Sequence, residues 1–279
     1  MRNNTIAIVI PCYNGWQYFS QCLASLEGQT IAPDEIIIVD DCSTDDSYFQ
    51  LCEYVKTSEL PITILRNEKN CGPSISRQNA LLKIKSTYVC FCDCDDWYEL
   101  DFIETIKKIV IENNVDLIIF DNYKIINGKR EKANTTKFLS NSSKKEVLAN
   151  YSMSLSRMVI GVDILKKISF PKLYHAEDGV VASQIIADAK SFIVLNEAYY
   201  NYLYRKNSAS KTKSASIVSE FLEAYYLKQK LIGSDYYNEL EYIGIKDILY
   251  GAVLNACKAR LKSSEIRKII DDFLTVYPI

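Results

Sequence analysis

Histidine is almost absent from this chain of 279 residues, which has His175 alone. Mechanisms that need two histidines, such as H-E-x-x-H hydrolysis, are therefore excluded. The nine cysteines include no C-x-x-C pair, although structural zinc sites typically use such pairs. We interpret the cysteines as small apolar side chains in a reducing compartment.

An excess of positive charge is also missing, since 33 Lys and Arg residues face 35 Asp and Glu residues. Dedicated nucleic-acid-binding proteins usually carry a basic excess, so we expect no nucleic-acid partner. No apolar run reaches the ~18 residues of a membrane-spanning helix. The first residues, Met1 to Asn4, do not resemble a secretory signal, so we expect a cytoplasmic protein.

Glycine-rich phosphate cradles are absent. Residues 11–15 (PCYNG) follow the first apolar run with one glycine, where a dinucleotide-binding fold needs G-x-G-x-x-G. The sequence also lacks the G-x-x-x-x-G-K-[ST] motif of P-loop proteins. A diphosphate bound here would have to be neutralised mainly by a metal ion.

Strand-like and helix-like patterns alternate through the first half of the chain. Short apolar runs of the kind found in strands covered on both faces recur between segments of helical periodicity. We expect strands at residues 6–10, 35–39, 62–65, 88–92 and 116–120. This alternation predicts an α/β fold with a mostly parallel, doubly wound sheet.

The second half is less regular, and it ends in a purely helical pattern. Asn127-Gly128 predicts a hairpin turn. The other expected elements are a loop at 129–143, a helix from 177, strands at 191–195 and 199–204, and helices at 221–232, 237–256 and 264–276.

A Ser- and Lys-rich loop at 207–216 is the best domain boundary. We expect a main domain at 1–212, divided into parts at 1–97 and 98–212. The remaining residues, 213–279, would form a C-terminal helical tail.

Acidic residues follow two of the expected strands. Asp40 and Asp41 end the second strand, and Asp93, Asp95 and Asp96 follow the fourth. Ligands of open α/β sheets bind at these carboxyl ends. Carboxylates so close together repel one another unless a cation lies among them, and their oxygens suit Mg²⁺ or Mn²⁺. Helix capping would explain one Asp at each end, but not three in four residues.

Four ordered segments carry a family resemblance. They are residues 6–14 (IAIVIPCYN), 36–45 (IIIVDDCSTD), 70–79 (NCGPSISRQN) and 89–97 (VCFCDCDDW). Their order and spacing resemble the inverting glycosyltransferases of family 2, which have the GT-A fold. Farther along, Glu177-Asp178 resembles the Glu-Asp pair before that family's acceptor-site helix, and Tyr202-x-x-Arg205 followed by Ser208 resembles its downstream segment.

The resemblance implies that residues 1–212 are a catalytic domain, with a nucleotide-binding half (1–97) and an acceptor half (98–212). The nucleotide site would be formed by residues of the first half. Pro11 and Tyr13 would line the pocket for the base and ribose. Asp41 would accept a hydrogen bond from the base, with Asp40 supporting the turn. Arg77 would lie beside the nucleotide.

The resemblance also implies roles for the later carboxylates. Asp93 would approach the ribose, and Asp95 would bind Mn²⁺ or Mg²⁺ at the diphosphate. Asp96 would share one of these tasks. Asp178 would be the general base, because an attacking hydroxyl with a high pKa needs a carboxylate within hydrogen-bond reach.

The implied activity is metal-dependent, inverting transfer of a sugar from a nucleotide-sugar to a hydroxyl. A UDP-sugar donor is favoured by analogy with the family, and the acceptor would be a glycan or lipid-linked saccharide in bacterial surface polysaccharide synthesis. Two alternatives stay open. A nucleotidyltransferase would normally show a Gly-rich, basic loop after the first strand, and a non-catalytic carbohydrate-binding protein would be free to lose the carboxylates.

Simpler structural roles also stay open for the site residues. Tyr13 could pack against the first helix, Arg77 could be a solvated charge, and Glu177-Asp178 could cap a helix. His175 could be a wall residue or a contact to metal or acceptor.

The loop before the tail is basic, with Arg205, Lys206, Lys211 and Lys213 interleaved with serines. We hypothesise that it closes over the donor diphosphate or a lipid-phosphate acceptor. It would also allow peripheral contact with the inner face of the membrane, at about 1 kcal/mol per charge. A solvated linker is the alternative. The tail would then be available for self-association as a homo-oligomer or for resting on the bilayer.

Overall fold

The computed structural model describes residues 4–137, 139–151, 154–205, 215–246, 251, 253–258 and 260–276. Within these ranges, no helix has both the length and the apolar character needed to cross a lipid bilayer.

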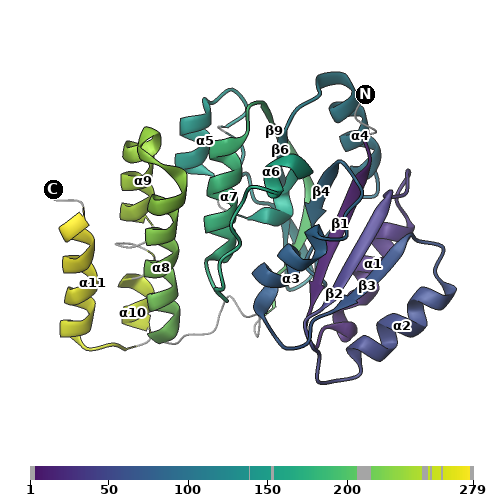
Figure 1. The fold of residues 1–279 in the computed structure, drawn as a ribbon, viewed down its shortest axis with the longest axis horizontal. Helices are drawn as coiled ribbons and strands as arrows, with labels where there is room; N and C mark the ends of the chain where they lie inside the picture. The colour runs from purple at the N-terminus through teal and green to yellow at the C-terminus, as the bar shows by residue number, and fades with distance from the viewer. Residues whose placement is uncertain are drawn as a thin grey trace.

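The described part of the chain contains nine strands and a series of helices (Figure 1). The strands are β1 (Ile6–Cys12), β2 (Glu35–Asp40), β3 (Ile62–Arg66), β4 (Tyr88–Phe91), β5 (Trp97–Tyr98), β6 (Leu117–Ile126), β7 (Lys129–Lys132), β8 (Met158–Gly161) and β9 (Phe192–Leu203). The helices are α1 (Phe19–Glu27), α2 (Ser47–Thr57), α3 (Gly72–Leu81), α4 (Phe102–Asn113), α5 (Lys144–Asn150), α6 (Val162–Leu165), α7 (Glu177–Asp188), α8 (Ala215–Ile232), α9 (Tyr237–Gly244), α10 (Val253–Lys258) and α11 (Ser263–Val276).

The strands form one sheet in the order β3-β2-β1-β4-β8-β6-β9-β5, with β7 paired to β6. Strands β1 to β4 are parallel to their neighbours in this group. Strand β8 runs antiparallel to both β4 and β6, and β9 runs parallel to β6. The α/β fold is therefore confirmed, with the parallel arrangement concentrated in the first half and a mixed sheet in the second.

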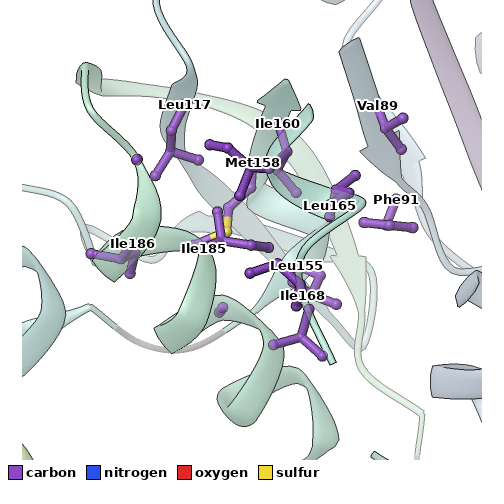
Figure 2. Packing of buried hydrophobic residues seen from close by; sticks show 14 of the residues in the cluster. Val89, Phe91, Leu117, Leu155, Met158, Ile160, Leu165, Ile168, Ile185 and Ile186 are labelled. Carbon is purple, nitrogen blue, oxygen red and sulfur yellow. The ribbon is translucent and has the colours of Figure 1, made fainter. Parts of the chain in front are cut away.

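Both faces of the central strands are covered, which explains their unbroken apolar runs. Alternate residues of a strand point to opposite faces, so Ile8 of β1 packs beneath α1 and α4 while Val9 packs beneath α3 and α7. Figure 2 shows the second of these clusters where Ile160 of β8 meets Leu165 of α6 and Ile185 of α7. The core thus lies on both sides of the sheet and leaves its carboxyl edge for the site.

Two expectations about the second half need correction. The strands expected at 191–195 and 199–204 are one long strand, β9, whose register against β6 shifts near Asp121. A bulge of this kind lets one strand bend without ending. The loop expected at 129–143 begins instead with a strand, β7, which pairs with β6. The helix expected at 237–256 includes α9 and α10, and residues 247–250 and 252 between them lie outside the described part of the chain. The hairpin at Asn127-Gly128 is confirmed, since it joins β6 to β7.

The first tail helices pack on the rest of the chain. Leu240 and Ile243 of α9 belong to the same apolar cluster as the central strands, and Ala224 of α8 packs with Val180 of α7. Helices α10 and α11 add a smaller cluster with Tyr225 of α8. Figure 1 shows these helices in successive rows leading away from the sheet beyond α7. The boundary expected at 212–213 lies outside the described residues.

Candidate functional site

The candidate site lies where β1, β2 and β4 end, at one edge of the parallel sheet. Residues in register there include Pro11 opposite Val39 and Cys12 opposite Asp40. The acidic segment after β4 emerges beside them, because Cys92 N donates to Val9 O at 3.0 Å. The motifs separated in sequence therefore meet in space.

Asp41 fixes the loop that leads into α3. Its Oδ1 accepts from Asn67 Nδ2 at 2.7 Å and Cys71 N at 2.9 Å, and its Oδ2 accepts from Gly72 N at 2.7 Å. The carboxylate is buried, and an ionised carboxylate offers about four lone-pair positions. Capacity for one ligand hydrogen bond therefore remains beside these three protein contacts.

Asp40 is wholly buried and belongs to the turn after β2. Arg66 Nε lies 3.1 Å from its carboxylate, and Ser43 N donates to it at 3.3 Å. This arrangement directs Asp40 into the protein and leaves Asp41 nearer the edge of the sheet where the candidate site lies.

The loop after β1 presents Tyr13, while Pro11 is buried within the strand. Tyr13 is largely exposed, so a role in packing the first helix is not supported. Asn14, which sequence reasoning missed, adopts a left-handed backbone at φ 49°. Its Oδ1 accepts from Thr44 N at 2.8 Å and joins the loops after β1 and β2. The tolerance of Asn for this conformation was the available signal.

Arg77 is buried between carboxylates from both halves of the chain. Its Nη2 donates to Asp93 Oδ1 at 2.9 Å and its Nη1 to Asp178 Oδ1 at 2.7 Å, with Glu177 at 3.6 Å. Burial lowers the pKa of the guanidinium, but the charges of these carboxylates outweigh burial and raise the pKa above its ordinary value. The solvated-charge interpretation of Arg77 is therefore wrong.

Glu177 and Asp178 open α7, but neither is its N-cap. That position belongs to Ala176, which has a left-handed backbone and no side-chain capping bond. Asp178 Oδ2 instead accepts from Leu155 N at 3.3 Å. The Asp178 side chain is 24% exposed and the Glu177 side chain 11%. Asp178 is the more accessible of the two to an incoming hydroxyl.

Burial raises the pKa values of both carboxyl groups. For Glu177, burial and then the charge of Asp178 raise the pKa to about 8, against the opposing charge of Arg77. For Asp178, burial raises the pKa above its ordinary value, while the charge of Arg77 opposes the increase. Arg77 therefore helps to keep Asp178 ionised despite its burial.

The three Asp residues after β4 have different surroundings. The side chains of Asp93 and Asp95 are 40% and 14% exposed. Asp96 points inward, where Tyr200 Oη donates to its Oδ2 at 2.6 Å and Leu203 N to its Oδ1 at 2.7 Å. The structure thus brings Asp93 and Asp95 to the site and gives Asp96 an anchoring contact with β9.

Asp95 is paired with Arg205. The guanidinium donates from Nε to Asp95 Oδ2 at 2.7 Å, its Nη2 contacts the same oxygen, and its carbon lies 4.0 Å from the centre of the Tyr18 ring. Burial and the nearby charge of Asp93 raise the pKa of Asp95, and Arg205 lowers it. Of the basic loop residues, Lys206, Lys211 and Lys213 lie outside the described part of the chain.

Asp93 and Asp95 fit a divalent cation. Arg77 already pairs with Asp93 and Arg205 with Asp95, so a cation bound here would share these carboxylates with the two guanidinium groups. One or two carboxylates commonly hold Mg²⁺ together with substrate phosphates. Within the described ranges, no three His, Cys, Asp or Glu side chains form a complete protein metal site. The donor set therefore suits a cation shared with a phosphate ligand.

Residues 7–167 match the family model for glycosyl transferase family 2. The chain belongs to this family. The family 2 segment covers β1 through α6 and contains the proposed nucleotide-site residues, whereas Asp178 lies just beyond it.

Two curated relatives align with three-quarters of the length of this family 2 chain. Glycosyltransferase GlyA of Streptococcus pneumoniae is 29% identical over 227 residues, which are 75% of this chain but 32% of GlyA. The chain thus spans about a third of that relative's length. The Escherichia coli UDP-Glc:alpha-D-GlcNAc-diphosphoundecaprenol beta-1,3-glucosyltransferase WfgD is 26% identical over 212 residues, covering 75% of this chain and 80% of WfgD.

A crystal structure of Staphylococcus aureus TarS 1–349 in complex with UDP-GlcNAc has the same fold. Its TM-score is 0.77 at 21% sequence identity, with 97% of this chain and 80% of that chain covered. The likeness extends beyond the family 2 segment, so it includes α7 and the first tail helices.

Proposed function

We propose that this chain is a metal-dependent, inverting glycosyltransferase acting in the synthesis of a bacterial surface polysaccharide. It transfers a sugar from a nucleotide-sugar to a hydroxyl of a glycan or lipid-linked saccharide. The observation that carries the proposal is the position of Asp178, whose partly exposed carboxylate is joined through Arg77 to Asp93 on the donor side.

The donor in this proposal is a UDP-sugar. Tyr13 is exposed for stacking on the base, and Asp41 keeps acceptor capacity at the end of β2. The names of WfgD and of the TarS complex both contain a UDP-sugar, which supports this donor class. Pro11 would form the wall behind the base.

Asp93 and Asp95 would hold Mn²⁺ or Mg²⁺. When bound, the metal neutralises charge on the nucleoside diphosphate that leaves. Arg205 pairs with Asp95, so its guanidinium is placed to contribute positive charge on the same side.

Asp178 takes the proton in this reaction. The acceptor O–H bond breaks as its proton passes to the carboxylate, and the acceptor oxygen forms a bond to the anomeric carbon. The bond from that carbon to the diphosphate oxygen breaks at the same time, with its electron pair leaving on the diphosphate. A single displacement with one base inverts the anomeric centre.

Arg77 holds Oδ1 of Asp178, and Oδ2 has a long hydrogen bond from Leu155 N. Oδ2 is therefore the better placed oxygen to receive a proton. The same guanidinium contacts Asp93, so base and donor-side carboxylate share one rigid support.

The decisive experiment is Asp178→Asn with labelled UDP-sugars and product analysis. Turnover should fall by about 10² to 10⁴, the usual contribution of a positioned base, with donor affinity unchanged. Asp188→Asn is the matched control, because Asp188 is exposed at the other end of α7. Near-normal turnover of Asp178→Asn would move the base role to Glu177 or His175. Formation of a sugar nucleotide from a triphosphate would instead identify a nucleotidyltransferase.

Membrane contact and self-association form a separate part of the proposal. The basic residues of the loop before α8 would bring a cytoplasmic enzyme to anionic lipid, close to a lipid-linked acceptor. Sedimentation with vesicles containing anionic lipid tests this contact. Light scattering of the full chain tests whether the tail forms a homo-oligomer.

A further inference from the structure

A carboxylate from the helical tail reaches the turn that precedes the proposed base. Glu220 Oε2, on α8, accepts from Tyr174 N at 2.8 Å and from His175 N at 2.7 Å. His175 Nδ1 lies 3.4 Å from the same oxygen. One side chain of the tail thus fixes two consecutive amides located only a few residues before Asp178.

The turn held in this way has an unfavourable backbone conformation. Ala176 has φ 61° and is the N-cap of α7. The left-handed region is unfavourable for a residue with a Cβ, and such a conformation persists when its surroundings enforce it. The hydrogen bonds of Glu220 supply that enforcement immediately upstream.

Apolar packing secures the same turn. Leu173, Ala176 and Val180 pack in one cluster with Ala224 and Leu227 of α8. The start of α7 is therefore held by α8 on the apolar side and by Glu220 on the polar side. This double attachment sets the direction in which the first turn of α7 presents its side chains.

We infer that Glu220 is a positioning residue for Asp178, so that tail helix α8 completes the active site. The inference rests on the proposed function, because it assigns Glu220 a role through the proposed base. Glu220 does not touch the reacting atoms; it holds the turn from which α7 begins. Small displacements of a catalytic group can reduce turnover by about 10²-fold.

Four variants of the full chain test the inference. Glu220→Ala should lower kcat by about 10- to 100-fold, with the donor KM within about twofold of wild type. Glu220→Asp, which keeps the charge but shortens the side chain, should show the same defect and serves if the alanine variant folds poorly. Glu220→Gln should recover kcat to within about threefold, since its amide oxygen can accept both hydrogen bonds. Glu223→Ala, at an exposed position on α8, is the control.

Two further measurements separate positioning from general stability. Hydrogen exchange at residues 174–178 should speed up in Glu220→Ala and remain slow in Glu220→Gln. Adding Glu220→Ala to Asp178→Asn should cause almost no further loss of kcat, because residues acting as a unit are not additive. An equal loss in both backgrounds, or a defective Glu220→Gln, would overturn the inference.

The outcomes also separate this inference from the proposed function. Normal turnover in Glu220→Ala together with an inactive Asp178→Asn contradicts only the positioning role. Near-normal turnover in Asp178→Asn contradicts the proposed base, whatever the tail variants show.

Discussion

Arg77 and Asp178 are 101 positions apart in the chain, yet their side chains meet in a hydrogen bond of 2.7 Å. The contact joins α3 in the first half of the chain to α7 in the second. Because the same guanidinium also holds Asp93, the proposed base and the proposed donor-side carboxylate are coupled through a single buried cation.

Replacing Arg77 should therefore damage both stability and turnover. Arg77→Met leaves Asp93, Glu177 and Asp178 without their shared counter-charge, and loss of one partner of a buried ion pair typically costs about 3–5 kcal/mol. Arg77→Lys keeps the charge but not the two-armed contact, so it should fold and still lose turnover. Denaturant unfolding and kcat measure the two effects.

Arg130→Met is the control for Arg77. Arg130 pairs with Glu99 at 2.6 Å, but both side chains are substantially exposed. The unfolding free energy of the Arg130→Met variant should differ from that of the wild type by no more than about 1 kcal/mol. If Arg77→Met were equally mild, the buried contacts would have no special energetic role.

Glu177→Gln should change how stability depends on pH. The pKa of Glu177 in the folded chain is about 8, above its ordinary value of 4.5, so the folded state binds this proton more tightly than the unfolded state. The contribution of Glu177 to stability is thus present below pH 4.5 and is lost as pH rises towards about 8. The Tm of Glu177→Gln relative to wild type should therefore increase between these pH values. A constant Tm difference would show that Glu177 titrates normally.

Asp95 and Asp96 are adjacent, but their substitutions should affect different properties: ligand binding for Asp95 and stability for Asp96. Asp95→Asn should weaken metal-dependent binding of a UDP-sugar by at least about tenfold, with little change in Tm, since burial already disfavours its charge. Asp96→Asn should lower the unfolding free energy by about 1–3 kcal/mol, because Asn replaces one of the two oxygens that accept from Tyr200 Oη and Leu203 N with a donor NH2 group.

Calorimetry with Mn²⁺ and thermal unfolding distinguish these two effects. Chelation should reproduce the Asp95→Asn result in the wild-type chain. Full activity in excess EDTA would contradict a metal at Asp93 and Asp95.

Gly72→Ala should weaken donor binding. Gly72 has φ +83°, and an added Cβ would lie 3.2 Å from the ring of Tyr174. The displaced backbone would carry away the N–H group that Gly72 donates to Asp41. Titration with UDP-sugar should show the lower affinity, and adding Tyr174→Ala should restore part of it.

Gly128→Ala is the matched control, because Gly128 has a similar φ of +77° with no neighbour within 4 Å of the added Cβ. It should lose stability to backbone strain while keeping donor affinity. A similar loss of affinity in both variants would rule out the steric explanation.

Local sequence patterns were sufficient to predict the parallel strands of the first half of the chain. Continuous apolar runs identify strands covered on both faces, and parallel strands bring their carboxyl ends to one edge. The gathering of Asp41, Asp93 and Asp95 could therefore be predicted. The inward turn of Asp96 could not, because it depends on a bond to Leu203, 107 residues away.

The second half of the chain was less predictable for the same reason, namely its dependence on contacts distant in sequence. The two apolar stretches that form β9 are separated by polar Asn196 and Glu197, which have the composition of a loop. Pairing with β6 on either side of these residues, at Val194 and at Ala198, carries the strand past them. Glu220 also carried no sequence signal, since its partners are backbone amides 45 and 46 positions away.

The position of β9 also determines the order in which the site can form as the chain is synthesised. Strands β1 to β4 need only the first 91 residues to pair, whereas Trp97 and Tyr98 pair with Asn201 and Tyr200. N-terminal segments fold first during translation. A ribosome-bound chain halted before residue 192 would thus contain the loop held by Asp41, but Asp96 would lack its hydrogen bonds from Tyr200 and Leu203. We expect a nascent chain to bind a UDP-sugar only when it is long enough for all of β9 to have left the ribosome.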